Sequence, residues 1–254
     1  MPTMGALHGG HLRMVEAARD ENDIVVVSVF VNPLQFGPNE DLDRYPRDWE
    51  RDRRVLEEAE VAAVYRPSVA EMYPAGATTR VRAGAVAETL EGAARPGHFE
   101  GVATVVTKLL ATAAPDRAYF GQKDAQQVAV VKRLVADLDL GVEVRVVATV
   151  REPDGLALSS RNVYLDPDER NAAVAISDSL RDAAGAYAGG ERDQGRLRAR
   201  IYARLALEPL VQPEYVELVD AATFEKPGTL AVIAARVGKT RLIDNHDVSK
   251  PLVG

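Results

Sequence analysis

The apolar run at residues 24–31, Ile-Val-Val-Val-Ser-Val-Phe-Val, constrains the fold more than any other segment. Such a β-branched run without polar alternation is typical of a strand buried on both faces of a parallel sheet. A helix is predicted before it at residues 12–20, with Leu12, Val15 and Ala18 facing inward. The alternation continues with predicted helices at 48–60, 103–113 and 124–137 and predicted strands at 62–65, 117–120 and 143–150. Strands separated by helical crossovers favour a Rossmann-like α/β fold, in which helices cover both faces of a parallel sheet.

The pattern changes after residue 150. Residues 151–155, which include Pro153, Asp154 and Gly155, are typical of a turn and predict a hinge between domains. Beyond them the sequence predicts helices at 167–188 and 194–207, followed by strands at 215–219, 230–236 and 240–243. We therefore predict two domains, an α/β domain at residues 1–150 and a smaller C-terminal α+β domain at residues 151–254.

The composition argues against several classes of protein. The 254-residue chain has a formal net charge of −7 and no basic stripe, so we expect no nucleic-acid partner, because such binding depends on neutralising phosphates. The chain contains no cysteine, which excludes disulfides and thiolate chemistry. No apolar run reaches membrane-spanning length and no signal peptide opens the chain, so we expect a soluble, cytoplasmic protein without a membrane partner. Small anionic ligands stay possible, because a local pocket can be positive on an acidic protein.

Two histidines, His8 and His11, flank Gly9 and Gly10 near the start of the first predicted helix. Residues three apart lie on one face of a helical turn, and the N–H groups and positive dipole end of such a turn favour a phosphate. Imidazoles add directed donors and can be charged beside an anion, while the glycines let a nucleotide approach the backbone. The pattern indicates a phosphate site, and a pair of solvent-facing histidines in a glycine-rich loop is the alternative.

A second polar cluster, at residues 121–124, directly follows the predicted strand 117–120. Gly121 permits a sharp turn, Lys123 supplies a positive charge for a phosphate, and Asp124 can hold Mg²⁺. An ordinary strand-to-helix turn, in which Asp124 caps the next helix, is the alternative. Both interpretations can be true together.

Two further clusters follow turns or strands. Ser159, Ser160 and Arg161 combine hydroxyl groups with a guanidinium, which suits a phosphate clamp on a mobile loop. The same string also suits a capping segment before the helix at 167–188. Asn32 and Gln35 place two amides at the carboxyl end of the strand at 24–31, where parallel sheets bind their ligands.

Six strings, in order along nearly the whole chain, resemble the pantothenate synthetase family. They are Pro2-Thr3-Met4-Gly5-Ala6-Leu7-His8-x-Gly10-His11, Val31-Asn32-Pro33-x-Gln35-Phe36, Arg95-Pro96-Gly97-His98-Phe99-x-Gly101-Val102, Phe120-Gly121-x-Lys123-Asp124-x-x-Gln127, Asp154-Gly155-Leu156-Ala157-x-Ser159-Ser160-Arg161-Asn162 and Arg241-Leu242-Ile243-Asp244-Asn245. The resemblance implies membership of the H-I-G-H nucleotidyltransferase superfamily. It also implies the reaction: ATP and pantoate give pantoyl adenylate and pyrophosphate, and β-alanine then displaces AMP to give pantothenate.

The resemblance further implies roles for individual residues, with Mg²⁺ accompanying ATP. Catalysis would fall to His11 as proton donor and to His8, Lys123 and Arg161. ATP would be bound by Met4, Gly5, His8, Gly10, His11, Gly121, Lys123, Asp124, Val150, Leu158, Ser159, Ser160 and Arg161. Asp124 would help to hold the metal ion, and pantoate would contact Gln35, Gln127 and Met4.

Residues 1–150 would then bind the nucleotide and pantoate, and residues 151–254 would act as a lid that carries the flexible Ser159–Arg161 loop. Because the family is commonly dimeric, we expect a homodimer. Arg95 and His98 are expected to support the site without taking part in the chemistry, and His246 is expected to be exposed.

One departure from the family concerns the start of the chain. In the family the Pro-Thr-Met-Gly string follows a hydrophobic strand, whereas here it follows Met1 directly. We therefore expect that the first strand is missing from this sequence, that its neighbours have unpaired edges, and that the natural chain begins upstream of Met1. Two alternatives to the ligase stay open: another small-substrate adenylyltransferase, and a non-catalytic nucleotide-binding remnant.

Overall fold

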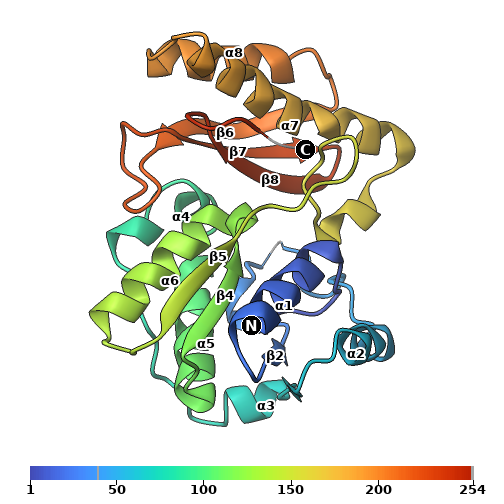
Figure 1. The fold of residues 1–254 in the computed structure, drawn as a ribbon, viewed down its shortest axis with the longest axis vertical. Coiled ribbons are helices and arrows are strands. Elements are labelled where there is room, and N and C mark those ends of the chain that lie inside the picture. Colours follow the sequence, from blue (N-terminus) through green and yellow to red (C-terminus); the bar gives the residue numbers. More distant parts are fainter. Residues whose placement is uncertain (39, 253–254) are drawn as a thin grey trace. The chain divides into compact units, whose positions relative to one another are not determined.

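The chain forms two compact units, shown in Figure 1. The structure, a computed structural model, describes residues 1–38 and 40–252. Unit 1 consists of Met1–Gly121 and Gln126–Ala148, and unit 2 consists of Gln122–Ala125 and Thr149–Gly254. The short segment Gln122–Ala125 thus belongs with the C-terminal part of the chain, which the sequence pattern did not indicate. None of the described helices has the length and hydropathy needed to span a lipid bilayer.

Unit 1 is built on two parallel sheets. Strand β2 (Val26–Val29) pairs with β1 (Pro2–Thr3) on one side and with β3 (Ala63–Tyr65) on the other. Strand β4 (Arg117–Gly121) pairs with β5 (Glu143–Val147). Parallel neighbours require crossover connections, which are supplied by α1 (Gly9–Glu21), α2 (Trp49–Glu58) and α6 (Ala125–Asp137). The predicted parallel α/β architecture is confirmed.

Helices cover both faces of the β4–β5 sheet. Neighbouring side chains of a strand point to opposite faces, and β4 follows this rule. Ala118 and Phe120 pack in one apolar cluster with α5 (His98–Ala113) and α6, whereas Tyr119 packs in another with α1 and β2. The shorter elements of unit 1 are the helices α3 (Val69–Met72) and α4 (Glu91–Ala94) and the 3₁₀ turns η1 (Pro33–Gln35) and η2 (Ala85–Ala87).

Several boundaries differ from those predicted. Helix α1 begins at Gly9, not at residue 12, because His8 caps it, and α5 begins at His98, not at residue 103. The strand predicted at 24–31 is confined to Val26–Val29, and Ile24, predicted to be buried, is 70% exposed because it precedes the paired residues. Residues 2–3, for which no strand was predicted, form β1. The strand expected upstream of Met1 stays a prediction.

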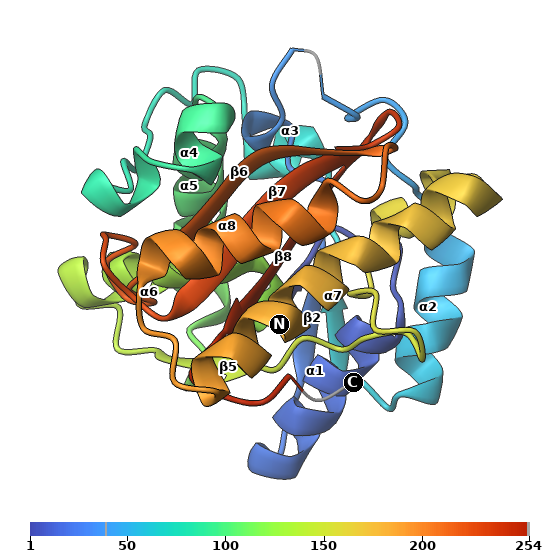
Figure 2. The ribbon, with the colours of Figure 1, turned by 90° about the horizontal axis from the view of Figure 1, so that it is seen from above.

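Unit 2 is an antiparallel sheet covered by two helices. Strands β6 (Val211–Val219), β7 (Leu230–Val237) and β8 (Thr240–Asp247) pair in this order. Figure 2 shows α7 (Pro167–Ala188) and α8 (Gln194–Leu205) side by side across one face of the sheet. Asp166 caps α7 by accepting the N–H groups of Asp168 and Glu169, and Pro167 occupies the first helical position, where its missing N–H costs nothing. The predicted smaller α+β architecture is confirmed.

Two 3₁₀ turns complete unit 2. Turn η3 (Gln122–Asp124) lies between β4 and α6 in the sequence, and η4 (Ser160–Tyr164) precedes α7. The core of the unit lies between helices and sheet, where Leu180, Ile201 and Ile233 are almost completely buried.

Candidate active site

His8 and His11 form a capping box at the start of α1. Nδ1 of His8 accepts the N–H of Gly10 at 3.2 Å, and Nδ1 of His11 accepts the N–H of His8 at 3.3 Å. The ring centroids lie 4.1 Å apart. Because each Nδ1 accepts a backbone hydrogen bond, a neutral ring carries its proton on Nε2. The turn therefore presents two Nε2–H donors at the positive end of a 13-residue helix.

Asp52, on α2, holds the backbone that leads into this turn. This residue is only 2% exposed, and its two carboxylate oxygens accept the N–H groups of Ala6 and Leu7 at 2.8 Å each. Gly5 has φ +78°, and a Cβ there would lie 2.8 Å from Oδ2 of Asp52. Both conformation and space thus require glycine at position 5. Sequence reasoning missed Asp52, although it stands four residues before the buried Leu56 and therefore on the buried helix face.

Met4 and Gln35, both predicted to contact pantoate, are brought together in unit 1. Nε2 of Gln35 lies 3.1 Å from Sδ of Met4. Oε1 of Gln35 accepts a hydrogen bond of 3.0 Å from the buried Asn32, whose amide also donates to the carbonyl of Gly101 at 3.1 Å. A Cβ on Gly101 would lie 2.3 Å from the carbonyl oxygen of Leu34, so this glycine allows α5 to approach η1 closely. The Gln35 amide is therefore fixed by its neighbours.

Arg95 and His98 both bind the backbone carbonyl of Gln35. Nη2 of Arg95 donates to it at 3.2 Å, and Nδ1 of His98 does so at 2.9 Å. Glu40 anchors Arg95 through two hydrogen bonds of 2.7 and 2.6 Å. Burial, aided by the positive charge of Arg95, lowers the pKa of His98 to about 4, so the ring is neutral at pH 7 and Nε2 accepts from Arg95 at 3.1 Å. This geometry fits the supporting role expected for both residues.

Turn η3 places Lys123 and Asp124 in unit 2. Nζ of Lys123 lies 3.6 Å from Oδ1 of Asp124. The side chain of Asn245, on β8, donates to the backbone carbonyls of Gln122 and Lys123 at 3.0 and 2.8 Å. Sequence reasoning assigned no role to Asn245, because the contact joins residues more than 120 positions apart and leaves no local pattern.

The predicted phosphate loop belongs to the same unit. Oγ of Ser159 accepts the N–H of Arg161 at 3.2 Å and so caps η4, which is the capping role that the sequence left as an alternative. The N–H of Leu158 donates to the carbonyl of Val150 at 2.9 Å. Lys123 and Ser159 line one small cavity of ≈ 10 Å³. Unit 2 therefore brings Lys123 and the loop together.

Gln127 and Gly121 lie in unit 1. Gln127 is half-buried on α6, whereas its neighbour Gln126 is buried and donates to the carbonyls of Val86 and Thr89 at 2.9 and 2.8 Å. A Cβ on Gly121 would meet only the sulfur of Met14, at 3.8 Å. Protein packing therefore does not explain why this position is glycine. His246, predicted to be exposed, is half-buried in unit 2, where Nε2 makes a hydrogen bond of 2.8 Å with the carbonyl of Lys250.

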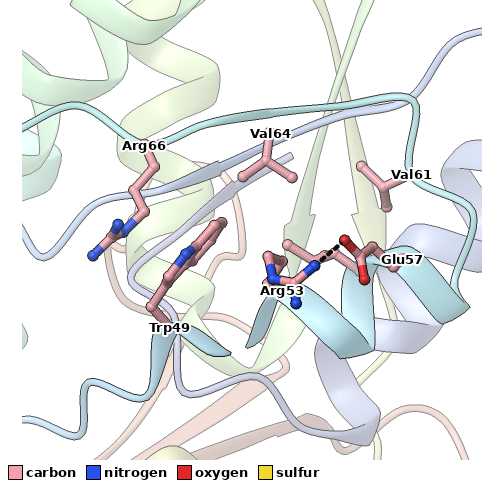
Figure 3. Close-up of a pocket in the computed structure, with 7 residues that line it drawn as sticks. Trp49, Arg53, Glu57, Val61, Val64 and Arg66 are labelled. Atoms are coloured by element: carbon pink, nitrogen blue, oxygen red, sulfur yellow. Dashed lines mark hydrogen bonds and ion pairs between the residues drawn. The ribbon is translucent and has the colours of Figure 1, made fainter. Parts of the chain in front are cut away.

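Two larger hollows of unit 1 contain none of the predicted site residues. Figure 3 shows a pocket of ≈ 370 Å³ in which Arg66 stacks on Trp49 at 4.5 Å, with the Arg53–Glu57 ion pair beside it. A groove of ≈ 890 Å³ runs past Val26 and Arg117, where β2 and β4 begin. Because parallel sheets bind ligands at the carboxyl ends of their strands, the groove at the start of β2 and β4 does not replace the candidate site.

Comparison with known proteins identifies the family. Residues 1–247 match the family model described as pantoate-beta-alanine ligase. The chain is 54% identical over 250 residues to the pantothenate synthetase of Roseiflexus sp. (strain RS-1), covering 96% of this chain and 90% of that protein. It is 56% identical over 251 residues to the pantothenate synthetase of Chloroflexus aurantiacus (strain ATCC 29366 / DSM 635 / J-10-fl), covering 96% and 89%.

Solved structures agree. The crystal structure of a pantothenate synthetase from Thermus thermophilus superposes with a TM-score of 0.95 at 49% identity, covering 98% of this chain and 92% of that chain. The Francisella tularensis pantoate-beta-alanine ligase, described as complexed with beta-gamma ATP and beta-alanine, superposes with a TM-score of 0.81 at 36% identity, covering 98% and 88%. The chain therefore belongs to the pantoate–β-alanine ligase family, the pantothenate synthetases.

Proposed function

We propose that this chain condenses pantoate with β-alanine in two steps, using ATP. In the first, a pantoate carboxylate oxygen forms a bond to the α-phosphorus of ATP while the bond between the α-phosphorus and the bridging oxygen breaks, releasing pyrophosphate. In the second, the β-alanine amine forms a C–N bond to the carboxyl carbon of pantoyl adenylate. The C–O bond to AMP then breaks, and the amine loses a proton. Neither step needs a covalent intermediate with the protein, so positioning and electrostatics carry the catalysis.

The capping box of His8 and His11 is the observation that carries this proposal. The first step moves negative charge onto the leaving pyrophosphate, and two Nε2–H donors at a helix N-terminus stabilise such charge. The backbone bonds to Nδ1 keep these donors from turning away. His11 serves as proton donor to the phosphates, and His8 supports it.

The unit 2 residues also bind phosphate groups of ATP in this proposal. Lys123 neutralises the leaving pyrophosphate, and Ser159, Ser160 and Arg161 close on the phosphates. The backbone around Val150 and Leu158 contacts the nucleotide, as do Met4, Gly5 and Gly10 of unit 1. Gly121 admits it closely, since no packing within the protein otherwise demands glycine there.

Gln35 and Gln127 hydrogen-bond pantoate, with Met4 packed against it. The fixed Gln35 amide supports this assignment, because Asn32 occupies its oxygen and thereby orients its N–H group. A preorganised donor discriminates better than a mobile one, since less side-chain freedom is lost on binding.

Asp124 would help to hold Mg²⁺. In the described part of the chain no group of three or more His, Asp or Glu side chains could hold a metal ion. A single half-exposed carboxylate nevertheless fits Mg²⁺, which is usually held by one or two carboxylates together with substrate phosphates and water. When bound, Mg²⁺ would neutralise phosphate charge.

The finer expectations of a homodimer and a cytoplasmic location also belong to this proposal. Family membership supports both. Sedimentation velocity of the purified protein tests the first, with a mass twice the 27.5 kDa of the chain expected. Fractionation of cells that express the protein tests the second.

A pyrophosphate-release assay with ATP, β-alanine and a panel of hydroxy acids tests the function. We expect release that requires pantoate, and AMP and pantothenate formation that also requires β-alanine. Release that requires another acceptor would favour a different adenylyltransferase. ATP binding in calorimetry without any release would favour a non-catalytic remnant.

A further inference from the structure

We propose that Asn245, on β8, is a positioning residue for Lys123 in adenylate formation, and that its neighbour Asp244 holds the segment that leads to Ser159. This inference rests on the function proposed above. It concerns contacts within unit 2 alone.

Asn245 forms hydrogen bonds with η3 through both the nitrogen and the oxygen of its side-chain amide. Nδ2 donates to the carbonyls of Gln122 and Lys123, and Oδ1 accepts from Nε2 of Gln122 at 3.1 Å. Asn245 is buried, and each of these three bonds is partly buried. Three hydrogen bonds from one amide leave η3 little freedom to rotate. The peptide carbonyl of Lys123 sets where its Cα lies, and hence where its side chain starts.

Asp244 fixes the other side of the strand, because consecutive side chains of a strand point to opposite faces. Its carboxylate forms a bidentate pair with Arg151 at 2.6 and 3.0 Å, and the two side chains are only 3% and 4% exposed. The same guanidinium donates to the carbonyl of Gly155 at 3.1 Å. Arg151, which forms an isolated antiparallel bridge with Ala157, thereby ties the segment that leads to Ser159 to β8.

The chemistry of the pair favours a positioning role over a purely stabilising one. A buried ion pair gains little net stability over apolar residues of the same volume, but it defines one geometry. The two backbone carbonyls that Asn245 binds carry negative partial charges, and the amide holds them at positions set by β8. A turn free to rotate could aim those carbonyls at the phosphates that Lys123 is proposed to bind. Asn245 therefore keeps these carbonyls from repelling the phosphates and also sets the position of Lys123.

A double-mutant cycle tests the proposal. The variants are Asn245→Ala, Lys123→Ala and the double variant, with kcat and KM for ATP measured by pantoate-dependent pyrophosphate release. Loss of positioning by about an ångström costs on the order of 10²-fold, so we expect Asn245→Ala to lower kcat/KM for ATP by roughly 10- to 100-fold. In the Lys123→Ala background the same change should cost less than about 2-fold, because residues that act through one another are not additive. KM for β-alanine should stay unchanged.

A milder variant and a control keep the cycle informative if Asn245→Ala folds poorly. Asn245→Ser retains a donor of smaller reach and should restore part of the activity. Ser179→Ala removes the buried hydrogen bond of 2.7 Å from Ser179 to Ile176 within α7 of the same unit and should leave kcat/KM unchanged. Thermal melting of each variant separates lost folding from lost rate.

Equal losses from Asn245→Ala with and without Lys123 would overturn the proposal, as would full activity of Asn245→Ala. Either result requires that the parent protein is active. If the parent protein itself releases no pyrophosphate with pantoate, the proposed function fails instead, and the two failures are thus distinguishable.

Discussion

The two turns proposed to bind phosphate are held by opposite chemistry. In unit 1 the carboxylate of Asp52 accepts two backbone N–H groups of the segment before His8. In unit 2 the amide of Asn245 donates to two backbone carbonyls of η3. Each turn depends on one buried side chain from a distant part of the chain, but one is held through its donors and the other through its acceptors.

The difference follows from what each turn contributes. Beside His8 the positive character comes from the imidazoles and the helix terminus. The N–H groups of Ala6 and Leu7 can therefore donate to Asp52 without weakening the phosphate site. In η3 the positive character resides on the side chain of Lys123. There the backbone carbonyls are the groups that would repel an anion, and these are the groups that Asn245 binds. In each turn, one buried side chain thus forms hydrogen bonds with the backbone groups that the ligand does not use.

His11→Ala should have the largest effect on the unit 1 turn. Removing a donor to developing charge costs on the order of 10²- to 10³-fold in kcat, and here it also removes the acceptor of the His8 N–H. We expect turnover in pyrophosphate release to fall by at least about 10²-fold. His246→Ala, which changes a histidine bound to the Lys250 carbonyl in unit 2, is the control and should keep full turnover. Unchanged turnover in His11→Ala would refute the role of His11.

Lys123→Ala, in the unit 2 turn, should lower kcat by about as much as His11→Ala, but it should also change the affinity for ATP. We expect kcat to fall on the order of 10²-fold, accompanied by weaker ATP binding, because the ammonium attracts the phosphates before reaction as well as during it. Calorimetric titration with ATP measures the binding, and initial rates measure kcat. Lys239→Ala, in the turn between β7 and β8, is the matched control. Normal ATP affinity in Lys123→Ala would contradict the role of Lys123 in ATP binding.

Asp52→Asn should weaken the unit 1 turn alone. The new amide NH₂ faces an N–H of Ala6 or Leu7, so one buried donor loses its partner. Such a loss costs about 1–3 kcal/mol of folding free energy. We expect kcat to fall about 10-fold, since the capping box loses its anchor without losing a ring. Denaturant melts and rates measure the two effects.

Combining Asp52→Asn with the other variants tests whether the two turns act independently. Asp52→Asn should be non-additive with His11→Ala, because both act on one turn, and additive with Lys123→Ala, because Asp52 and Lys123 belong to different compact units. Non-additivity with Lys123→Ala would mean that the two turns are not independent.

Local sequence patterns predicted the elements but not the side chains that hold the turns. Helix α7 spans the predicted residues 167–188 because its capping box and its proline act within four positions. Helix α1 was predicted too short because Gly9 and Gly10 disfavour a helix interior, whereas the His8–His11 capping box stabilises its first turn. Six strings in register then placed the candidate residues, since motif spacing is a local property.

Asp52 and Asn245 escaped prediction for a physical reason. Each binds backbone groups, which every residue carries, so the partner segment needs no matching side chain. Asp52 also lies in the helix predicted at 48–60, which contains so many charged residues that one more acidic residue does not indicate a special role. The available signal in the sequence was that Asp52 stands four residues before the apolar Leu56. For Asn245 only the resemblance of the string at 241–245 pointed to the position, without a role.

A further expected effect separates the two units by their response to acid. Because the folded pKa of His98, about 4, lies below its ordinary value of 6.5, the unfolded chain binds the proton first. The stability that this neutral histidine supplies is complete above about pH 6.5 and is lost as the pH falls toward 4, a loss of about 3 kcal/mol.

In unit 2 the guanidinium of Arg170 lowers the pKa of Asp154 below its ordinary 3.8, so the stability that Asp154 contributes is lost only at still lower pH. Between pH 7 and 4.5 the protection factors of amides in α5, which are hydrogen-exchange rates normalised to the intrinsic rate at each pH, should therefore fall before those of β7. His98→Asn, which keeps a donor for the Gln35 carbonyl but does not titrate, should abolish this pH dependence in α5, and an equal fall of the protection factors in both units of the parent protein would contradict this assignment.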